Sequence, residues 1–251
     1  MQYHIGLDEE TIHQAKYAIL PGDPGRVEKI AAYLDTPVKV GQNREYTSYV
    51  GYLAGQPVLV MSTGMGGPST AIGVEELAAI GVKTLIRVGT SGGMQTRVLP
   101  GDLVVVQGAI RQEGTSKEYL PIEFPAIADF TVTTALAAAA KTLDYPYHVG
   151  TVQCKDSFYG QHDPARMPVG DELLYKWNAW IRGGALASEM ETAALYTVSS
   201  VLGLRAGAIM LCIWNQEREK QGFSQQECHD TERAIRAAIG AMKLLIEADA
   251  K

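Results

Sequence analysis

Four short apolar runs, each bordered by turn-forming residues, constrain the fold of this chain most strongly. They are Tyr17–Leu20 before PGDPGR, Val58–Ser62 before TGMGGPS, Leu85–Val88 before GTSGG, and Leu103–Val106 after LPGD. Their length and their β-branched residues indicate buried strands. Helical patterns occupy the segments between and after them, at Pro68–Ile80, Phe130–Leu143 and Thr192–Leu202. Strands that alternate with helices predict an α/β fold with a mixed, mostly parallel central sheet flanked by helices.

The chain is predicted to form a single domain over residues 1–251. No repeat, low-complexity tract or linker rich in Pro, Gly and Ser divides its 251 residues. A last helix is expected after Ser224 and Glu227, which have the Ser-x-x-Glu spacing of a capping box. Its buried face is predicted by apolar residues at helical spacing, namely Ile235, Ile239, Met242 and Ile246.

Composition excludes several classes of partner. A formal charge of −6 argues against nucleic acid and anionic membrane, because both need clustered Lys and Arg. The longest apolar stretch, Ala206–Trp214, is too short to span a bilayer, and the first residues lack a signal pattern, so a cytoplasmic protein is expected. Three cysteines without C-x-x-C spacing, and scattered histidines, predict reduced thiols and no metal site.

Two glycine-rich loops could hold a small anion. PGDPGR places Gly22 and Gly25 where backbone N–H groups can approach a ligand, beside Arg26, although the same residues also form plain turns. Arg87 lies inside an apolar strand, just before GTSGG. A buried guanidinium needs either an anion such as phosphate, with Thr90 as a further donor, or an internal Asp or Glu. The residues alone leave these alternatives open.

Other phosphate motifs are weak or missing. Arg44 would be a third cation, but Glu45 beside it makes a surface salt bridge the simpler interpretation. The loop GMGGPS lacks the third glycine of a dinucleotide motif, and no P-loop occurs anywhere.

The stretch SEMETAAL has two interpretations. Ser188 and Glu191 have capping-box spacing, so they could satisfy free N–H groups at the start of a helix. Alternatively, a carboxylate at the edge of an apolar wall suits a ligand with adjacent hydroxyls, such as a ribose.

Seven ordered segments together resemble one family. PGDPGRVEKIA, REYTSYVGYLAGQPV, STGMGGPSTAI, RVGTSGG, EFPAIADF, KDSFYGQ and SEMETAAL are similar to the uridine phosphorylases of the nucleoside phosphorylase superfamily. The resemblance implies reversible cleavage of uridine by inorganic phosphate, which is a co-substrate, with no cofactor. It also implies catalytic arginines at Arg26, Arg44 and Arg87. The implied phosphate site consists of Gly22, Arg26, Arg87, Thr90 and, from a neighbouring subunit, Arg44.

The same resemblance implies how the sugar is held and how subunits assemble. Glu191 takes the 2′- and 3′-hydroxyls of ribose, Met190 packs on the sugar, and His4 of a neighbouring subunit meets the 5′-hydroxyl. Glu189 is expected to support Glu191, because positions two apart on a helix face away from one another. Sharing between subunits implies a homo-oligomer, a hexamer built from three dimers. A potassium site would map to Glu45, Met65 and Ser69.

The base pocket departs from the enterobacterial pattern FYPGQER. This chain has FYGQHDPAR, in which Phe158 is expected to stack on uracil and Gln161 to read its polar edge. The second donor is either Arg166 or Lys155. A purine phosphorylase is disfavoured because Asn215 replaces the aspartate that protonates a purine, while Trp214 is expected to pack in the core. A nucleosidase that uses water and a non-catalytic nucleoside-binding module are the remaining alternatives.

Overall fold

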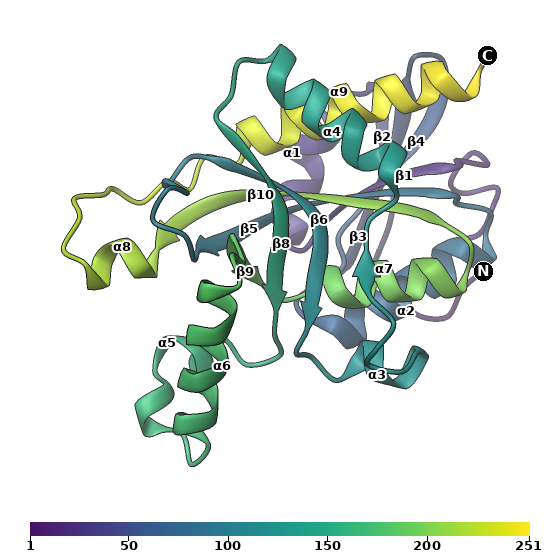
Figure 1. The fold of residues 1–251 in the computed structure, drawn as a ribbon. Helices are drawn as coiled ribbons and strands as arrows, with labels where there is room; N and C mark the ends of the chain where they lie inside the picture. The colour runs from purple at the N-terminus through teal and green to yellow at the C-terminus, as the bar shows by residue number, and fades with distance from the viewer.

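The computed structural model describes residues 1–251, and one ten-stranded sheet runs through it (Figure 1). The strands are β1 (Tyr17–Pro21), β2 (Asp35–Asn43), β3 (Tyr46–Leu53), β4 (Gln56–Met61), β5 (Thr84–Gly93), β6 (Leu103–Arg111), β7 (Ala126–Ile127), β8 (Tyr147–Cys154), β9 (Ala187–Glu189) and β10 (Arg205–Asn215). The α-helices are α1 (Val27–Ala31), α2 (Gly67–Ala79), α3 (Thr115–Tyr119), α4 (Phe130–Thr142), α5 (Phe158–His162), α6 (Gly170–Arg182), α7 (Thr192–Val201), α8 (Gln216–Lys220) and α9 (Glu232–Asp249). None of the helices is long and apolar enough to cross a membrane.

The sheet is mixed, and part of it closes on itself. Strand order is β10-β6-β8-β9-β5-β1-β4-β3-β2, and β10 also pairs with β5. The pairs β1–β4, β1–β5, β5–β10, β6–β8 and β8–β9 are parallel, whereas the β2–β3–β4 margin and the β5–β9, β6–β10 and β6–β7 pairs are antiparallel. Closure brings the end of β5 beside β9, with Gly92 opposite Ser188.

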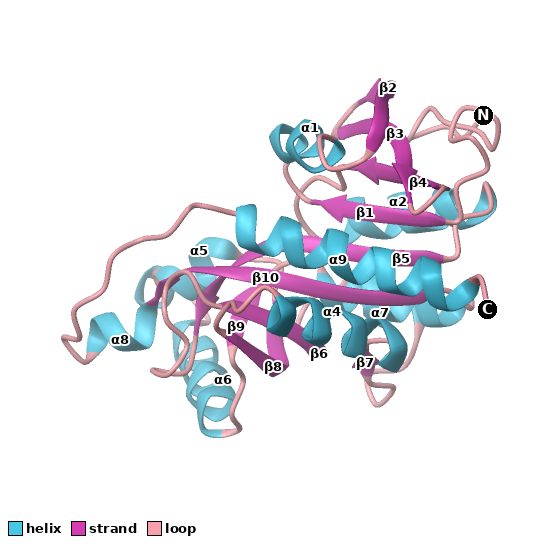
Figure 2. Cartoon of the chain, turned by 90° about the horizontal axis from the view of Figure 1, so that it is seen from above, coloured by secondary structure: helices cyan, strands magenta, loops and turns pink.

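Helices cover both faces of the sheet, as predicted. Successive strand residues point to opposite faces, so Ala18 and Leu20 join one apolar core while Tyr17 and Ile19 join the other. The first core is completed by α2 and α7, and the second by α1, α4 and α9. In Figure 1 α4 and α9 lie together above the sheet, away from α2 and α7, and Figure 2 gives the view from above. The α/β class with a mixed sheet between helices is therefore confirmed.

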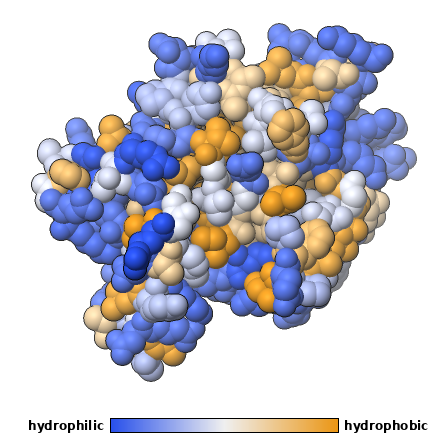
Figure 3. Space-filling model, in the orientation of Figure 1, coloured by the Kyte–Doolittle hydropathy of each residue, from blue (hydrophilic) through white to orange (hydrophobic).

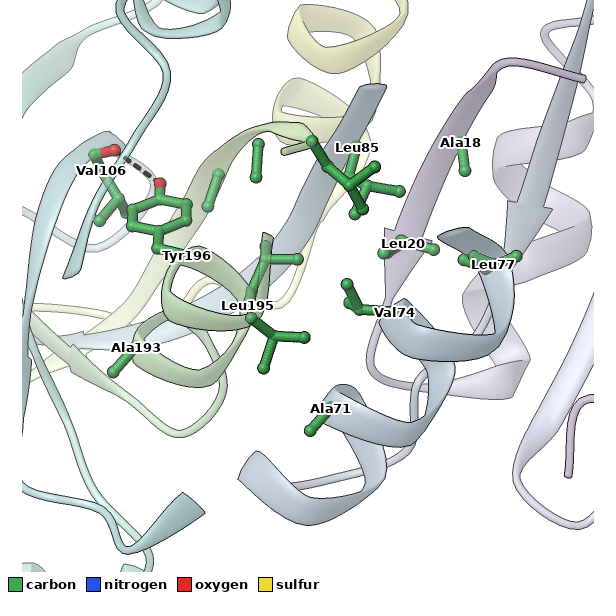
Figure 4. Close-up of a cluster of buried hydrophobic side chains, with 14 of the residues drawn as sticks. Ala18, Leu20, Ala71, Val74, Leu77, Leu85, Val106, Ala193, Leu195 and Tyr196 are labelled. Carbon is green, nitrogen blue, oxygen red and sulfur yellow. Dashed lines mark hydrogen bonds between the residues drawn. The ribbon is translucent and has the colours of Figure 1, made fainter. Parts of the chain in front are cut away.

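The core under α2 and α7 shows how these helices are anchored. In Figure 4 the apolar side chains of both helices meet those of β1 and β5, among them Leu20, Leu77 and Leu85. The Tyr196 hydroxyl, a polar side-chain group in this view, donates to the carbonyl of Val106 at 2.7 Å. Because that donor is satisfied, a buried tyrosine costs the core little. Because α7 is tightly packed, the carboxylates just before it, Glu189 and Glu191, are held in place.

The helix predictions are confirmed for α2, α4 and α7, whose bounds differ from the predicted ones by no more than one residue at either end. The cap predicted for the last helix is wrong. Ser224 and Glu227 lie in the loop between α8 and α9, and α9 begins at Glu232 after Thr231, which makes no side-chain capping bond. The amphipathic face of α9 nevertheless buries Ile235, Met242 and Ile246, so packing rather than capping fixes this helix.

A projection formed by α5 and α6 stands out from the body of the molecule (Figure 1). Its surface mixes hydrophilic and apolar groups at the lower left of Figure 3. Leu174 and Tyr175 of α6 are exposed, while Trp177 turns inward, is 6% exposed and donates to Glu217 at 2.8 Å. This contact ties the projection to α8 beside the ends of β8 and β10.

Candidate functional site

One cavity of about 880 Å³ collects most of the predicted site residues. The loops after β1, β4, β8 and β10 line it, together with β5 and the turn that joins β9 to α7. From the predicted set it contains Gly22, Arg26, Glu45, Met65, Arg87, Thr90, Lys155, Phe158, Gln161, Glu189, Met190 and Glu191. Four predicted residues do not line it: His4, Arg44, Ser69 and Arg166.

Arg87 is buried in the floor of this cavity and is only 4% exposed. Its Nη2 donates to Glu191, and its Nε lies 3.4 Å from a carboxylate oxygen of Glu189. Burial alone would lower the pKa of Arg87, but Glu191 and Glu189 outweigh it and raise that pKa. The alternative of an internal carboxylate is thus correct for Nη2, whereas Nε lies within ion-pair distance of Glu189 without forming a hydrogen bond.

The remaining nitrogen of Arg87 faces the first glycine loop. Nη1 is buried and has no hydrogen-bond partner in the protein. A Cβ built on Gly22 would lie 3.7 Å from Nη1 and 3.2 Å from the Gly64 carbonyl oxygen, so a glycine here keeps the approach open. An unpaired guanidinium donor in a buried position is costly. Arg87 therefore holds two carboxylates on one side and offers a donor to an anion on the other.

Arg26 and Thr90 complete the cationic end of the cavity. The Nε of Arg26 lies 3.7 Å from Asp23, and burial together with the charge of Arg87 lowers the pKa of Arg26. Two guanidinium groups that repel one another at one end of a cavity form a site for an anion between them. Thr90, partly exposed on β5, adds a hydroxyl to this wall.

The two carboxylates of SEMETAAL have different tasks. Glu189 accepts the backbone N–H groups of Glu191, at 2.9 Å, and of Thr192, at 3.0 Å, so it caps α7. Glu191 accepts the N–H of Gly66 at 2.6 Å, besides the Arg87 guanidinium. Gly66 has a φ of 92°, which only glycine adopts at little cost. Glu191 is therefore held in the cavity wall from two sides.

The capping-box interpretation of Ser188 and Glu191, one of the two that the sequence allowed, is wrong. Glu191 makes no side-chain bond as the N-cap of α7, and the Ser188 hydroxyl points to the opposite end of the cavity. There it accepts a hydrogen bond from Lys155 at 2.6 Å. The spacing of these residues matched a cap, but Ser188 lies in β9, whose residues alternate in direction.

Lys155, Phe158 and Gln161 form the other end of the cavity. Lys155 is 5% exposed, and burial lowers its pKa to about 8. Its Nζ lies 6.0 Å from the centre of the half-exposed Phe158 ring. His162, which the sequence analysis did not single out, packs on Phe158 at 4.2 Å between ring centres. Burial, and then the charge of Lys155, lower the pKa of His162, which favours its neutral form.

Arg166 does not reach this end of the cavity. It ends a short 3₁₀ turn, its side chain is 57% exposed, and its guanidinium lies 3.5 Å from Asp163 and 5.4 Å from the Tyr159 ring centre. The longer spacing in FYGQHDPAR directs this arginine outward. Of the two candidate second donors, only Lys155 lines the cavity.

Strand β10 forms one wall of the cavity, and Trp214 at its end is not in the core as predicted. Trp214, expected in the core, is only partly buried and lines the cavity with Ile213, and its indole donates to Glu219 at 2.9 Å. Asn215 is buried behind it, where its amide donates to the carbonyls of Gln95 and Val98. Since its oxygen accepts from two N–H groups of α8, Asn215 is wholly engaged in holding loops.

His4 and Arg44 lie together on the surface, outside the chain's own cavity. His4 Nδ1 is 2.7 Å from Glu76, and its carbonyl accepts from Asn43 at 2.8 Å. Exposed Arg44 lies over the Tyr3 ring at 5.9 Å. Glu45 accepts a hydrogen bond from the Ser69 hydroxyl at 2.6 Å, and it forms no ion pair with Arg44. The simple surface salt bridge is therefore absent.

The residues suggested for potassium provide a partial set of ligands. Glu45 and Ser69 bring three oxygens close together, and the Ser69 hydroxyl also contacts the Thr63 carbonyl. The Met65 side chain is 84% exposed and offers no oxygen there. Hard cations prefer several oxygen ligands, so this group fits as one part of a shared site, and potassium binding stays a prediction.

Replacement of Lys155 by methionine should increase stability at pH 7. A lysine with a folded pKa of about 8 binds its proton less tightly than in the unfolded chain. Its contribution to stability is therefore unfavourable below about pH 8 and improves as the pH rises toward its unfolded value of about 10.5. We expect Lys155→Met to raise the free energy of unfolding by about 1–3 kcal/mol at pH 7. Urea unfolding at pH 7 and pH 9.5 measures this, and a less stable variant would show that the ammonium is structural.

Several known proteins are similar in sequence to this chain over nearly its full length. Residues 16–244 match the model of the Phosphorylase superfamily. A uridine phosphorylase from Treponema pallidum (strain Nichols) is 58% identical over 248 residues, which cover 99% of this chain and 95% of that protein. One from Klebsiella aerogenes is 43% identical, covering 98% and 96% of the two chains. A guanosine phosphorylase from Halorubrum lacusprofundi is 39% identical, covering 97% and 99%.

Proposed function

Because the chain belongs to the phosphorylase superfamily, we propose that it catalyses the reversible phosphorolysis of uridine to uracil and ribose 1-phosphate. It is thus a pentosyltransferase enzyme. The uridine phosphorylases from Treponema pallidum and Klebsiella aerogenes match it over nearly its full length and at higher identity than the guanosine phosphorylase. The site assignment rests on the Arg87 guanidinium. Its Nη2 donates to Glu191, while its Nη1 has no partner in the protein and is available to an anion.

The cavity orders the reactants along its length. Phosphate fits between Arg26 and Arg87 beside Gly22 and Thr90, and the ribose hydroxyls fit Glu191 with Met190 against the sugar. Uracil then fits the far end, where Phe158 stacks and Gln161 and Lys155 face its carbonyl oxygens. Shared contact of Arg87 with phosphate and Glu191 would fix the distance between nucleophile and sugar, which is the main requirement of a displacement reaction.

The reaction develops positive charge on the sugar and negative charge on the base. As the C1′–N1 bond breaks, its electron pair passes to the base while a phosphate oxygen forms the new bond to C1′. Positive charge on the sugar lies beside phosphate and Glu191, and negative charge on uracil meets the donors at the far end. Since these groups are fixed by their own hydrogen bonds, little reorganisation is needed during the reaction.

We place His4 and Arg44 in the site of a neighbouring subunit. Both are surface residues, they lie close together through Tyr3 and Asn43, and their own cavity excludes them. A homo-oligomer, here a hexamer of three dimers, would bring the pair to a second copy's phosphate and sugar. The three free cysteines fit a reducing compartment such as the cytoplasm.

The proposed function is tested by base release from uridine, thymidine and inosine, each with and without phosphate. We expect uracil release from uridine only when phosphate is present, with inosine cleaved at least about 10²-fold more slowly, because Asn215 cannot protonate a purine. Cleavage without phosphate would indicate a nucleosidase. Preference for inosine would indicate a purine enzyme, and tight uridine binding without turnover a binding module.

A further inference from the structure

A chain of polar side chains runs behind the base end of the cavity. The Lys155 ammonium donates to the Ser188 hydroxyl at 2.6 Å, Ser188 contacts the amide oxygens of Gln153 and Gln161, and the Gln153 amide donates to Gln112. Gln153 is 2% exposed and Ser188 is 3% exposed. Buried polar groups linked in this way restrict one another's orientation.

The hydroxyl of Ser188 can serve only one of the two amides. It has a single proton to donate, and Gln153, whose amide nitrogen is occupied by Gln112, keeps its oxygen turned toward Ser188. The amide nitrogen of Gln161 also has a partner, Gln216, but at 3.5 Å this contact is at the limit of hydrogen-bond distance. The proton of Ser188 therefore goes to Gln153, and the Ser188 oxygen accepts from Lys155. Gln161 is the more weakly held amide, and it can turn toward a base.

Lys155 has more donors than partners. An ammonium carries three N–H groups, yet its only side-chain hydrogen bond is to the neutral hydroxyl of Ser188. A second cavity of about 350 Å³ adjoins its other side, so Lys155 stands in the partition between two cavities. Burying a cation whose only side-chain hydrogen bond is to a neutral group is expensive, and the nearby charges of Glu189 and Glu191 offset only part of that cost. The arrangement is explained if the spare donors meet negative charge that appears during the reaction.

We propose that Ser188, oriented from behind by Gln153, is the positioning residue that aims the Lys155 ammonium at the departing base. The inference rests on the proposed function, since the base must leave with the electron pair of the C1′–N1 bond. That pair delocalises onto the ring carbonyl oxygens, where an N–H of Lys155 stabilises it, and no proton is transferred. Ser188 touches neither phosphate nor sugar in this scheme.

The test compares Ser188→Ala with Ser188→Thr, which keeps the hydroxyl, using uridine and 5-fluorouridine. Fluorine withdraws electrons, so the fluorinated base leaves more easily and needs less help from a cation. We expect Ser188→Ala to lower kcat for uridine about 30-fold and for 5-fluorouridine about 3-fold, with the KM for phosphate unchanged. Ser188→Thr should recover most of the uridine rate, and Gln153→Met should reproduce the pattern of Ser188→Ala more weakly.

The pH profile provides a second readout that a merely structural serine would not move. The charged groups and thiol facing Lys155 are Glu189, Glu191, Cys154 and His162, with Asp156 and Lys220 on the adjoining cavity wall. Activity should fall as the pH rises above about 8, where the ammonium loses its proton. Loss of the Ser188 acceptor destabilises the charged form, so Ser188→Ala should shift this fall to lower pH.

The outcomes separate this inference from the function on which it rests. A wild-type protein that releases no base with phosphate overturns both. Phosphate-dependent cleavage by the wild type, with equal losses for the two nucleosides and an unmoved pH profile in Ser188→Ala, overturns the positioning role alone. Circular dichroism of each variant checks that the fold is retained, and Ser188→Thr supplies the result if Ser188→Ala fails to fold.

Discussion

Arg87→Ala is expected to lower phosphate-dependent cleavage of uridine by about 10²–10³-fold. The change removes the buried donor at Nη1, and one fixed hydrogen-bond donor at a reacting anion contributes about 3–4 kcal/mol. It also leaves Glu189 and Glu191 buried without their cation. The free energy of unfolding should therefore fall by about 3–5 kcal/mol. Steady-state rates against phosphate concentration, together with urea unfolding, measure the two effects.

Arg87→Lys separates the two consequences. A lysine keeps a positive charge for the carboxylates but lacks the planar fork that binds two groups at once. We expect most of the stability to return, while the KM for phosphate stays raised by roughly 10²-fold or more. Normal phosphate dependence in either variant would contradict the anion site and reduce Arg87 to an internal ion pair.

The sequence predicted the class of the fold because its signals were local. Apolar runs bordered by glycine-containing turns predicted β1, β4, β5 and β6, and the apolar periods predicted α2, α4 and α7. The ring in which β10 pairs with both β5 and β6 depends on contacts between distant segments. No local pattern encodes such pairing.

Arg87 illustrates why the site could be predicted only in part. From the sequence, phosphate and an internal carboxylate were competing partners for one guanidinium. In the structure β5 directs Nη2 toward Glu191 and Nη1 toward the Gly22 loop, where Nη1 has no partner in the protein, so phosphate at Nη1 stays a prediction. Sequence spacing indicates which residue types lie near one another in the chain. It does not indicate which acceptor each nitrogen of one guanidinium meets.

The errors have related causes. Capping spacing recurs at Ser188 and Ser224, but a cap also requires the serine to stand immediately before its helix, and neither does. Arg166 was one of two candidates because its position after the inserted residues could not be fixed. His162 was missed because no sequence motif marks it, although it lines the cavity and packs on Phe158.

Glu191→Gln is expected to lower kcat/KM for uridine by about 10²-fold or more. A carboxylate has about four acceptor positions, of which Gly66 and Arg87 occupy two, so two remain for the 2′- and 3′-hydroxyls of ribose. Each hydrogen bond to a charged group is worth about 1.5–3 kcal/mol. For 2′-deoxyuridine, which lacks one hydroxyl, the loss should be about 10-fold smaller.

The amide is chosen because it preserves the volume and one acceptor oxygen of Glu191, while Glu189 continues to neutralise Arg87. The fold should therefore survive, and the KM for phosphate should rise less than it does in Arg87→Lys, since Nη1 is untouched. The measurement is the ratio of the losses for the two nucleosides at saturating phosphate. Equal losses for the two nucleosides would show that Glu191 does not bind the 2′-hydroxyl. An unchanged rate for uridine would show that this carboxylate only holds Arg87 and Gly66 in place.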